Sequence, residues 1–154
     1  MIDHLSRAPQ ATEFACSRFL VPSIQKSGWA LFIDCDMLFL GDVAELFAYA
    51  DPRYAVMCVK HDYEPKESVK MGGHEQTSYH RKNWSSVMLW NCDHPSNNRL
   101  TVDIVNSWPG LLLHRFSWLK DEDIGELPQE WNWLVNVQEK PQSPKLAHFT
   151  LGGP

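Results

Sequence analysis

Short apolar runs alternate with polar segments along most of the chain, and this pattern predicts an α/β domain. Apolar runs of this length are typical of strands that are buried on both faces of a sheet. They occupy residues 29–33, 37–40, 54–59, 86–90 and 145–149. Helices are expected between the runs, because capping residues precede apolar positions there. These helices occupy residues 13–25, 43–49 and 99–106.

Polar side chains set the expected starts of the three helices. Thr12 and Asn98 stand at N-cap positions, and Asp42 begins a segment that resembles a capping box because Glu45 follows three residues later. Pro22 falls inside the first helix. We therefore expect that helix to break close to this proline, which cannot donate a backbone hydrogen bond.

A long polar segment at residues 61–82 differs from the rest of the chain. It is charged, and it contains three histidines and the pair Gly72-Gly73. Long polar loops of this kind in α/β enzymes often cover a binding site. We therefore expect the segment to close over a ligand as a lid.

Length and charge narrow the classes of protein. A chain of 154 residues is long enough for one domain with a real core, so a single domain over residues 1–154 is predicted. The net charge of −5, with mixed signs, argues against nucleic acid as a partner. No segment approaches the roughly 18 apolar residues of a membrane span. We expect no membrane span and allow for a homodimer.

The four cysteines are scattered along the chain and form no CxxC motif. This spacing is typical of reduced thiols rather than of a disulfide framework or a zinc site. The N-terminus also lacks the apolar core of a signal peptide. These features predict a cytoplasmic protein.

Asp34 and Asp36 follow directly after the apolar run at residues 29–33. In an extended segment, residues two apart point to the same side, so both carboxylates are aimed at one point. Two neighbouring carboxylates are costly to bury unless a cation offsets their repulsion. Hard oxygen ligands suit Mg²⁺ or Mn²⁺, so the pair predicts a divalent metal site at the end of a strand.

His148 lies in the last apolar run, just before a turn that contains Gly152 and Gly153. Glycines allow backbone to come close to a ligand, so both are candidates for cofactor binding. An imidazole added to two carboxylates favours Mn²⁺ over Mg²⁺. His148 is therefore the candidate third metal ligand.

Several segments, taken in order, resemble GT-A-fold glycosyltransferases of the glycogenin and LgtC type (family 8). They are residues 17–22, the stretch 29–41 with its DxD motif, residues 83–91, the pairs 127–128 and 131–132, and residues 148–154. The resemblance implies a Rossmann-like mixed sheet flanked by helices. It also implies transfer of a hexosyl group from a nucleotide sugar, most simply a UDP-sugar, to a hydroxyl acceptor such as a carbohydrate.

Individual site residues are implied by the same resemblance. Both DxD acids and His148 would bind Mn²⁺, and Arg18 would face the nucleotide or the sugar. The segment at residues 83–86 resembles the family's "FNSGV" strand, so Asn83, Ser85 and Ser86 would line the sugar pocket. The resemblance further implies retention of anomeric configuration, although the residues themselves offer no obvious nucleophile.

The acidic and aromatic segments late in the chain are further candidates. Asp121 and Asp123 resemble the acidic patch that contacts donor or acceptor hydroxyls, and they are the candidate catalytic residues. Trp131 and Trp133 could stack on the face of a sugar, but tryptophans in such a segment more often belong to the core.

The chain departs from the family before the DxD strand. Only 28 residues precede that strand, which is room for about one helix, whereas the family begins with a strand–helix unit that binds the nucleobase. We therefore expect a domain that is truncated at its N-terminus.

Two alternatives remain open from the sequence. Haloacid dehalogenase-type phosphohydrolases also carry a DxD after an apolar strand, with the first acid, here Asp34, as the nucleophile. That motif expects Thr or Val where this chain has Leu38. The other alternative is a non-catalytic fragment that binds nucleotide sugars.

Overall fold

A computed structural model describes residues 15–62, 81 and 83–152. Its central sheet has four strands in the order β1-β4-β3-β5. These are β1 (Trp29–Ile33), β3 (Val56–Cys58), β4 (Val87–Asn91) and β5 (Ile124–Glu126). β4 runs antiparallel to β1 and β3, whereas β3 and β5 are parallel. The sheet is therefore mixed, as the sequence predicts.

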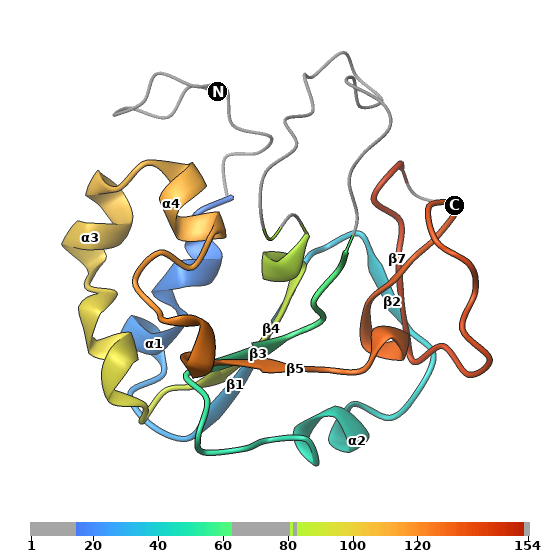
Figure 1. Cartoon of the computed structure of the whole chain (residues 1–154), viewed down its shortest axis with the longest axis horizontal. Helices are drawn as coiled ribbons and strands as arrows, with labels where there is room; N and C mark the ends of the chain where they lie inside the picture. Colours follow the sequence, from blue (N-terminus) through green and yellow to red (C-terminus); the bar gives the residue numbers. More distant parts are fainter. Residues whose placement is uncertain (1–14, 63–80, 82, 153–154) are drawn as a thin grey trace.

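A second, smaller sheet lies beside the first (Figure 1). Its strands are β2 (Met37–Phe39), β6 (Trp133–Leu134) and β7 (Leu146–His148), in the order β2-β7-β6. β7 pairs antiparallel with β2 and parallel with β6. The chain passes from the first sheet to the second through residues 34–36, which join β1 to β2.

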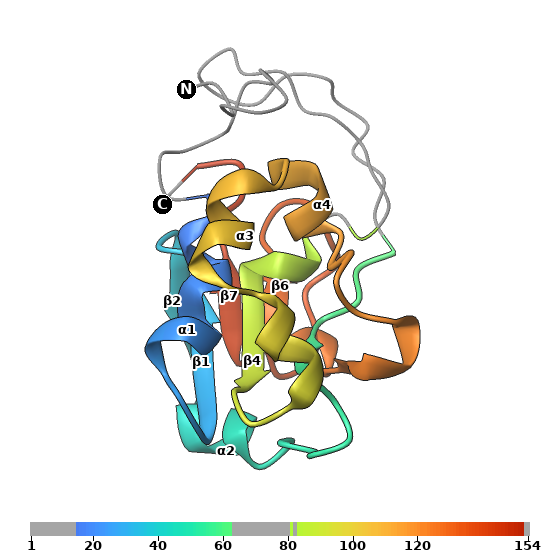
Figure 2. The same ribbon diagram turned by 90° about the vertical axis from the view of Figure 1, so that its left-hand side faces the viewer.

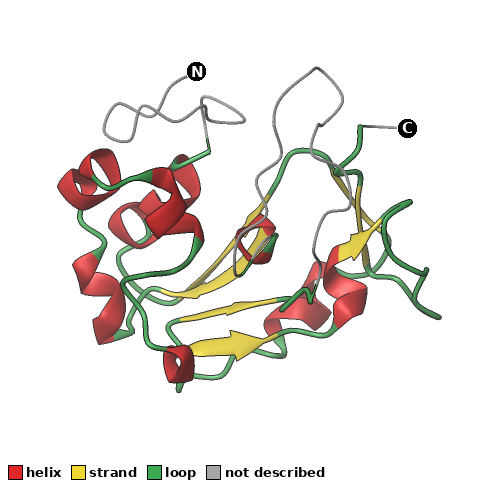
Figure 3. Ribbon diagram, turned by 45° about the horizontal axis from the view of Figure 1, so that its top comes forward, coloured by secondary structure: helices red, strands yellow, loops and turns green. Residues whose placement is uncertain are grey.

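Short helices flank the four-stranded sheet (Figures 2 and 3). The α-helices are α1 (Val21–Ile24), α2 (Val43–Phe47), α3 (Val102–Ser107) and α4 (Gly110–His114). The 3₁₀ turns are η1 (Ser17–Leu20), η2 (Trp84–Ser86), η3 (Pro95–Arg99), η4 (Asp121–Asp123) and η5 (Gln129–Asn132). α1, α3 and α4 gather on one side of the four-stranded sheet, and α2 lies apart from them (Figure 1). In the part of the chain that the structure describes, no helix has the length and hydropathy needed to cross a membrane.

The alternation of side chains along β4 builds two cores. Met88 and Trp90 pack with Phe19 and Leu113 on the side of α1 and α4. Val87 and Leu89 join a second cluster, with residues of α2, η5 and β7, on the opposite side. β4 is thus buried on both faces at all five positions, as the apolar run predicts.

The prediction of a fully buried strand at residues 29–33 is wrong in one respect. β1 has the predicted bounds, but each of its five residues is only partly buried. The reason is its position, since β1 lies at the edge of the described sheet and pairs only with β4.

One predicted helix start needs correction, and another is confirmed. The expected break close to Pro22 coincides with the change from η1 to α1 after Leu20. Pro22 itself stands in the first turn of α1, where an N–H would have no intrahelical acceptor. Asn98 lies inside η3, and Thr101 caps α3 instead by accepting a hydrogen bond from Ile104 N at 3.2 Å. Asp42 caps α2 as predicted. Thr12 and most of the expected lid, at residues 63–80 and 82, lie outside the described residues.

Candidate metal centre

The two DxD acids lie in the connection between the sheets. Asp34 N donates to Ser86 O at 3.0 Å, which continues the pairing of β1 with β4 by one residue beyond the strands. Asp36 O accepts a hydrogen bond from Phe149 N at 2.9 Å, which opens the pairing of β2 with β7. Backbone hydrogen bonds on both sides therefore fix where the two carboxylates lie.

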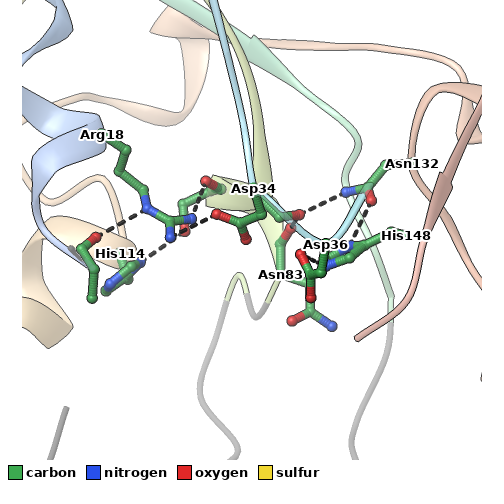
Figure 4. Close-up of polar contacts among 10 residues, drawn as sticks. Arg18, Asp34, Asp36, Asn83, His114, Asn132 and His148 are labelled. Atoms are coloured by element: carbon green, nitrogen blue, oxygen red, sulfur yellow. Dashed lines mark hydrogen bonds and ion pairs between the residues drawn. The ribbon is translucent and has the colours of Figure 1, made fainter. Parts of the chain in front are cut away.

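His148 joins the two acids because of the register of the second sheet. Met37 pairs with His148, so the ring comes next to the residue before Met37, which is Asp36. One ligating atom from each of Asp34, Asp36 and His148 falls within 4.8 Å of the others. His148 Nε2 lies 3.4 Å from Asp36 Oδ1 (Figure 4). The structure thus brings together the three residues that the sequence names as metal ligands.

The carboxylate of Asp34 forms an ion pair with Arg18. Arg18 Nη2 lies 2.8 Å from Asp34 Oδ1, and both side chains are largely buried. Burial nevertheless raises the pKa of Asp34 above its usual value, and the positive charge of Arg18 only partly offsets this effect. Keeping Asp34 charged therefore costs free energy, and a further cation beside it would reduce that cost.

Arg18 is itself fixed by several contacts. Its Nε donates to Ala15 O at 3.0 Å, and its Nη1 donates to Ser85 O at 2.6 Å. Its guanidinium carbon lies 4.9 Å from the centre of the Phe32 ring. The resemblance implies that Arg18 faces the nucleotide or the sugar. In the structure, the guanidinium of Arg18 forms an ion pair with Asp34.

The predicted sugar-pocket residues lie in and before η2, next to the acids. Asn83 has a left-handed backbone, with φ of 64°, and begins this turn. Ser85 Oγ lies 2.7 Å from Nδ1 of His114, at the end of α4. Ser86 Oγ donates to Asn83 O at 2.7 Å. Both serines are buried, so they are part of the wall of the site rather than of its open surface.

Three polar residues at or near the site were not predicted as functional from the sequence. Asn132, at the end of η5, is fully buried, and its Oδ1 lies 3.0 Å from His148 Nδ1. His114 contacts Ser85, as described above. His61 is 4% exposed, and burial together with the nearby His148 lowers the pKa of its imidazole to about 4. The only signal for Asn132 was the Trp-Asn pair within the resemblance.

The candidate catalytic acids do not join the metal site. Ile124 pairs with Val56, Val56 pairs with Trp90, and Trp90 pairs with Ala30. The N-terminal end of β5, with the acids of η4 just before it, is therefore level with Ala30. That level lies about 13 Å along the strand from Asp34, at roughly 3.3 Å per residue.

Each of these two acids has a partner elsewhere. Asp123 Oδ2 accepts a hydrogen bond from Ser96 Oγ at 3.0 Å. Asp121 is 89% exposed and pairs with Arg81. The structure does not bring either acid to the three metal-site residues, and the function proposed below does not use them.

The remaining candidates are the two C-terminal glycines and the two tryptophans near η5. Gly152 is exposed and has a left-handed φ of 124°, in a turn closed by its N–H and Phe149 O. Gly153 lies outside the described residues. Trp131 is 1% exposed and belongs to the core, as the more common role of such tryptophans predicts. Trp133 is partly buried, and its indole N–H donates to Gln138 O at 3.4 Å.

The donor set of this cluster fits a divalent cation. Two carboxylates supply hard oxygen ligands, and a neutral imidazole supplies nitrogen, a combination that suits Mn²⁺ and also accepts Mg²⁺. Asp36 is 41% exposed, so the cluster remains open to solvent on one side. That opening leaves room for a ligand to complete the coordination of a bound ion.

Comparison with known proteins defines the fold class. The chain has TM-scores of 0.56 with the glycosyltransferase GlyE of Streptococcus pneumoniae, at 14% identity, and 0.56 with mouse xyloside xylosyltransferase 1, at 13% identity. The matches cover 86% and 90% of this chain, and 36% and 65% of those chains. The apo form of GlyE matches with a TM-score of 0.55, at 12% identity, over 90% of this chain and 38% of that one. The chain therefore has the fold of these glycosyltransferases.

One curated protein is similar in sequence. The chain is 52% identical over 151 residues to Protein CDI of Arabidopsis thaliana, and the match covers 94% of this chain and 58% of that protein. The chain thus spans little more than half of its relative. No family model matches the chain.

Proposed function

We propose that this protein binds a divalent cation, Mn²⁺ or Mg²⁺, and uses it to transfer a hexosyl group from a nucleotide sugar to a hydroxyl acceptor. The observation that carries the proposal is the convergence of Asp34, Asp36 and His148 on one point of a glycosyltransferase fold. A bound divalent ion would neutralise the diphosphate of the leaving nucleotide.

The chain's own residues have separate roles in this proposal. Asp34, Asp36 and His148 hold the ion. Arg18 stabilises the charged form of Asp34 and fixes its position through the ion pair. Asn83, with the serines of η2 behind it, forms the polar wall that faces the sugar. The proposal leaves the attacking group open, because no described carboxylate outside the ligand set lies at the cluster.

The proposal extends to the donor and the cell compartment. A UDP-sugar is the donor we propose, with a carbohydrate or another hydroxyl compound as acceptor. All four cysteines are free thiols, which supports a reducing compartment such as the cytoplasm. The assembly that we propose is a homodimer.

Neither of the two alternatives from the sequence gains support. In a phosphohydrolase, Asp34 would be a free nucleophile, but Arg18 holds its carboxylate at 2.8 Å. A late histidine, rather than an acidic pair, also completes the cluster. The non-catalytic fragment differs from an enzyme only in turnover, so the experiment below includes a turnover measurement.

A thermal-shift panel with Mn²⁺ and either UDP or GDP tests the proposal. Wild-type protein should gain stability with Mn²⁺ and UDP together, and Asp36→Asn should lose that gain. Asp103→Asn is the matched control, because Asp103 is an exposed residue of α3 far from the cluster in sequence. Equal shifts in wild type and Asp36→Asn would refute the metal assignment.

Release of UDP from UDP-sugars then separates an enzyme from a binding fragment. Turnover that depends on Mn²⁺ and on Asp36 supports the transferase. A UDP-dependent thermal shift without turnover would identify a binding protein instead.

A further inference from the structure

A directed series of hydrogen bonds connects a backbone carbonyl to the ring of His148. Ser86 Oγ lies 2.7 Å from Asn83 O, and Asn132 Nδ2 lies 2.8 Å from Ser86 Oγ. His148 Nδ1 lies 3.0 Å from Asn132 Oδ1 (Figure 4). Ser86, Asn132 and His148 are all buried, so each polar atom depends on its partner within the protein.

The direction of each bond follows from the first acceptor. A carbonyl oxygen can only accept, so the single proton of the Ser86 hydroxyl is donated to Asn83 O. Ser86 Oγ must then accept from its other neighbour, which identifies the near end of the Asn132 amide as the NH₂ group. The amide oxygen therefore faces His148, and Nδ1 of that ring carries the proton.

We propose that Asn132 is a positioning residue that fixes the tautomer of His148. With the proton on Nδ1, the lone pair of Nε2 lies 3.4 Å from Asp36 Oδ1. Two acceptor atoms then face each other, and a cation between them would relieve the repulsion. This inference rests on the proposed function, in which His148 is a metal ligand. It adds that Asn132 keeps the Nε2 lone pair of His148 free to bind the ion.

The reversed arrangement satisfies fewer groups. It would turn Asn132 Oδ1 toward Ser86 and place an Nε2 proton toward Asp36. If the hydroxyl proton of Ser86 turned to Asn132 Oδ1, then Ser86 Oγ and Asn83 O would face each other as two acceptors 2.7 Å apart, and Asn83 O would keep only the longer bond from Ser86 N at 3.4 Å. The proton on Nε2 would gain only a long contact of 3.4 Å in exchange.

The tautomer can be measured directly by ¹⁵N NMR of histidine-labelled, metal-free wild-type protein. The measurement is made at about pH 8.5, where an ordinary imidazole is neutral. We expect a pyrrole-type signal from Nδ1 of His148 and a pyridine-type signal from Nε2. The opposite pattern would overturn the inference, whether or not the protein binds metal.

Two variants of Asn132 test its role with matched chemistry. Asn132→Asp loses the donor to Ser86 Oγ but keeps an acceptor opposite Nδ1, so it should keep the proton on Nδ1. Asn132→Leu removes the acceptor, should move the proton to Nε2, and should weaken Mn²⁺ binding by about tenfold or more. Asn98→Leu, the same substitution at an exposed position of η3, should change neither. An unchanged tautomer in Asn132→Leu would contradict the inference, and the wild-type spectrum decides the question if that variant does not fold.

Titration with Mg²⁺, which is diamagnetic, separates this inference from the proposed function. A shift of the Nε2 signal supports both. A proton on Nδ1 with no response of Nε2 to Mg²⁺ leaves the positioning role of Asn132 standing and counts against the metal site.

Discussion

His61 is buried in its neutral form, and this predicts how stability depends on pH. Burial and the nearby His148 lower the pKa of its imidazole from 6.5 to about 4. Gln138 Nε2 lies 3.2 Å from His61 Nδ1. An amide nitrogen can only donate, so Nδ1 accepts and the ring carries its proton on Nε2. Protonation would place two donors against each other.

The lowered pKa gives both the sign and the size of the effect. Below pH 6.5 the unfolded chain takes up a proton at this residue, whereas the folded protein takes it up only near pH 4. Neutral His61 therefore contributes its full stability above pH 6.5, and the contribution is lost as the pH falls toward 4. The two pKa values correspond to about 3 kcal/mol at the acidic limit, and about 2 kcal/mol of this is lost between about pH 7.5 and about pH 5.

Urea unfolding followed by tryptophan fluorescence measures this difference. We compare wild type with His61→Asn, whose amide oxygen can still accept from Gln138 but cannot titrate. The variant should lose about 2 kcal/mol less than wild type between the two pH values, with the same dependence on urea. An equal loss in both proteins would show that His61 does not carry the effect and would refute the reasoning.

Three further predictions concern the ion pair, the thiols and a helix cap. Arg18→Gln should lower the free energy of unfolding by about 2 kcal/mol in urea titrations, because it leaves Asp34 buried without its partner; an unchanged midpoint would count against a structural ion pair. Iodoacetamide should modify exposed Cys35 in the native protein and spare Cys58, because burial raises the pKa of the Cys58 thiol to about 12. Peptide mapping measures this, and native-state labelling of Cys58 would contradict it. Thr101→Ala should destabilise the protein by about 1 kcal/mol in the same titrations, because α3 loses its N-cap bond; no change would show that the cap contributes nothing.

The elements that local sequence determines were predictable. β1 has the expected bounds because five apolar residues end at an acid, and Asp42 caps α2 because its side chain reaches a backbone N–H two residues away. The edge position of β1 was not predictable. It depends on which strands pair in the sheet, and five apolar residues fit an edge strand as well as a central one.

The candidate site shows the same division. Asp34 and Asp36 were predictable as a pair because two acids follow an apolar strand directly, although Cys35 and Asp36 lie in a turn and not in the extended segment that the sequence suggests. The contacts of His148 with Asn132 and of Asn132 with Ser86 were not predictable, since they join residues 16 and 46 positions apart. The acids of η4 show how far composition alone can reach. Their composition suits sugar recognition, but the parallel pairing of β5 with β3 places them at the other end of the sheet.

The candidate metal cluster lies where the two sheets meet, and this position would link ion binding to folding. Asp34 ends the first sheet, whereas Asp36 and His148 belong to the edge of the second. Two carboxylates and the imidazole face one another across this junction, and Arg18 pairs with Asp34. An ion that binds the folded protein at 100 times its Kd would stabilise it by about 2.7 kcal/mol. Asp36→Asn should therefore remove the gain from the ion while changing the stability of the metal-free protein much less, because Asp36 is the exposed ligand and the substitution keeps both the Arg18–Asp34 pair and the His148–Asn132 bond. A loss confined to the ion-bound protein would distinguish a metal centre from a pair of acids that serve only to shape the loop.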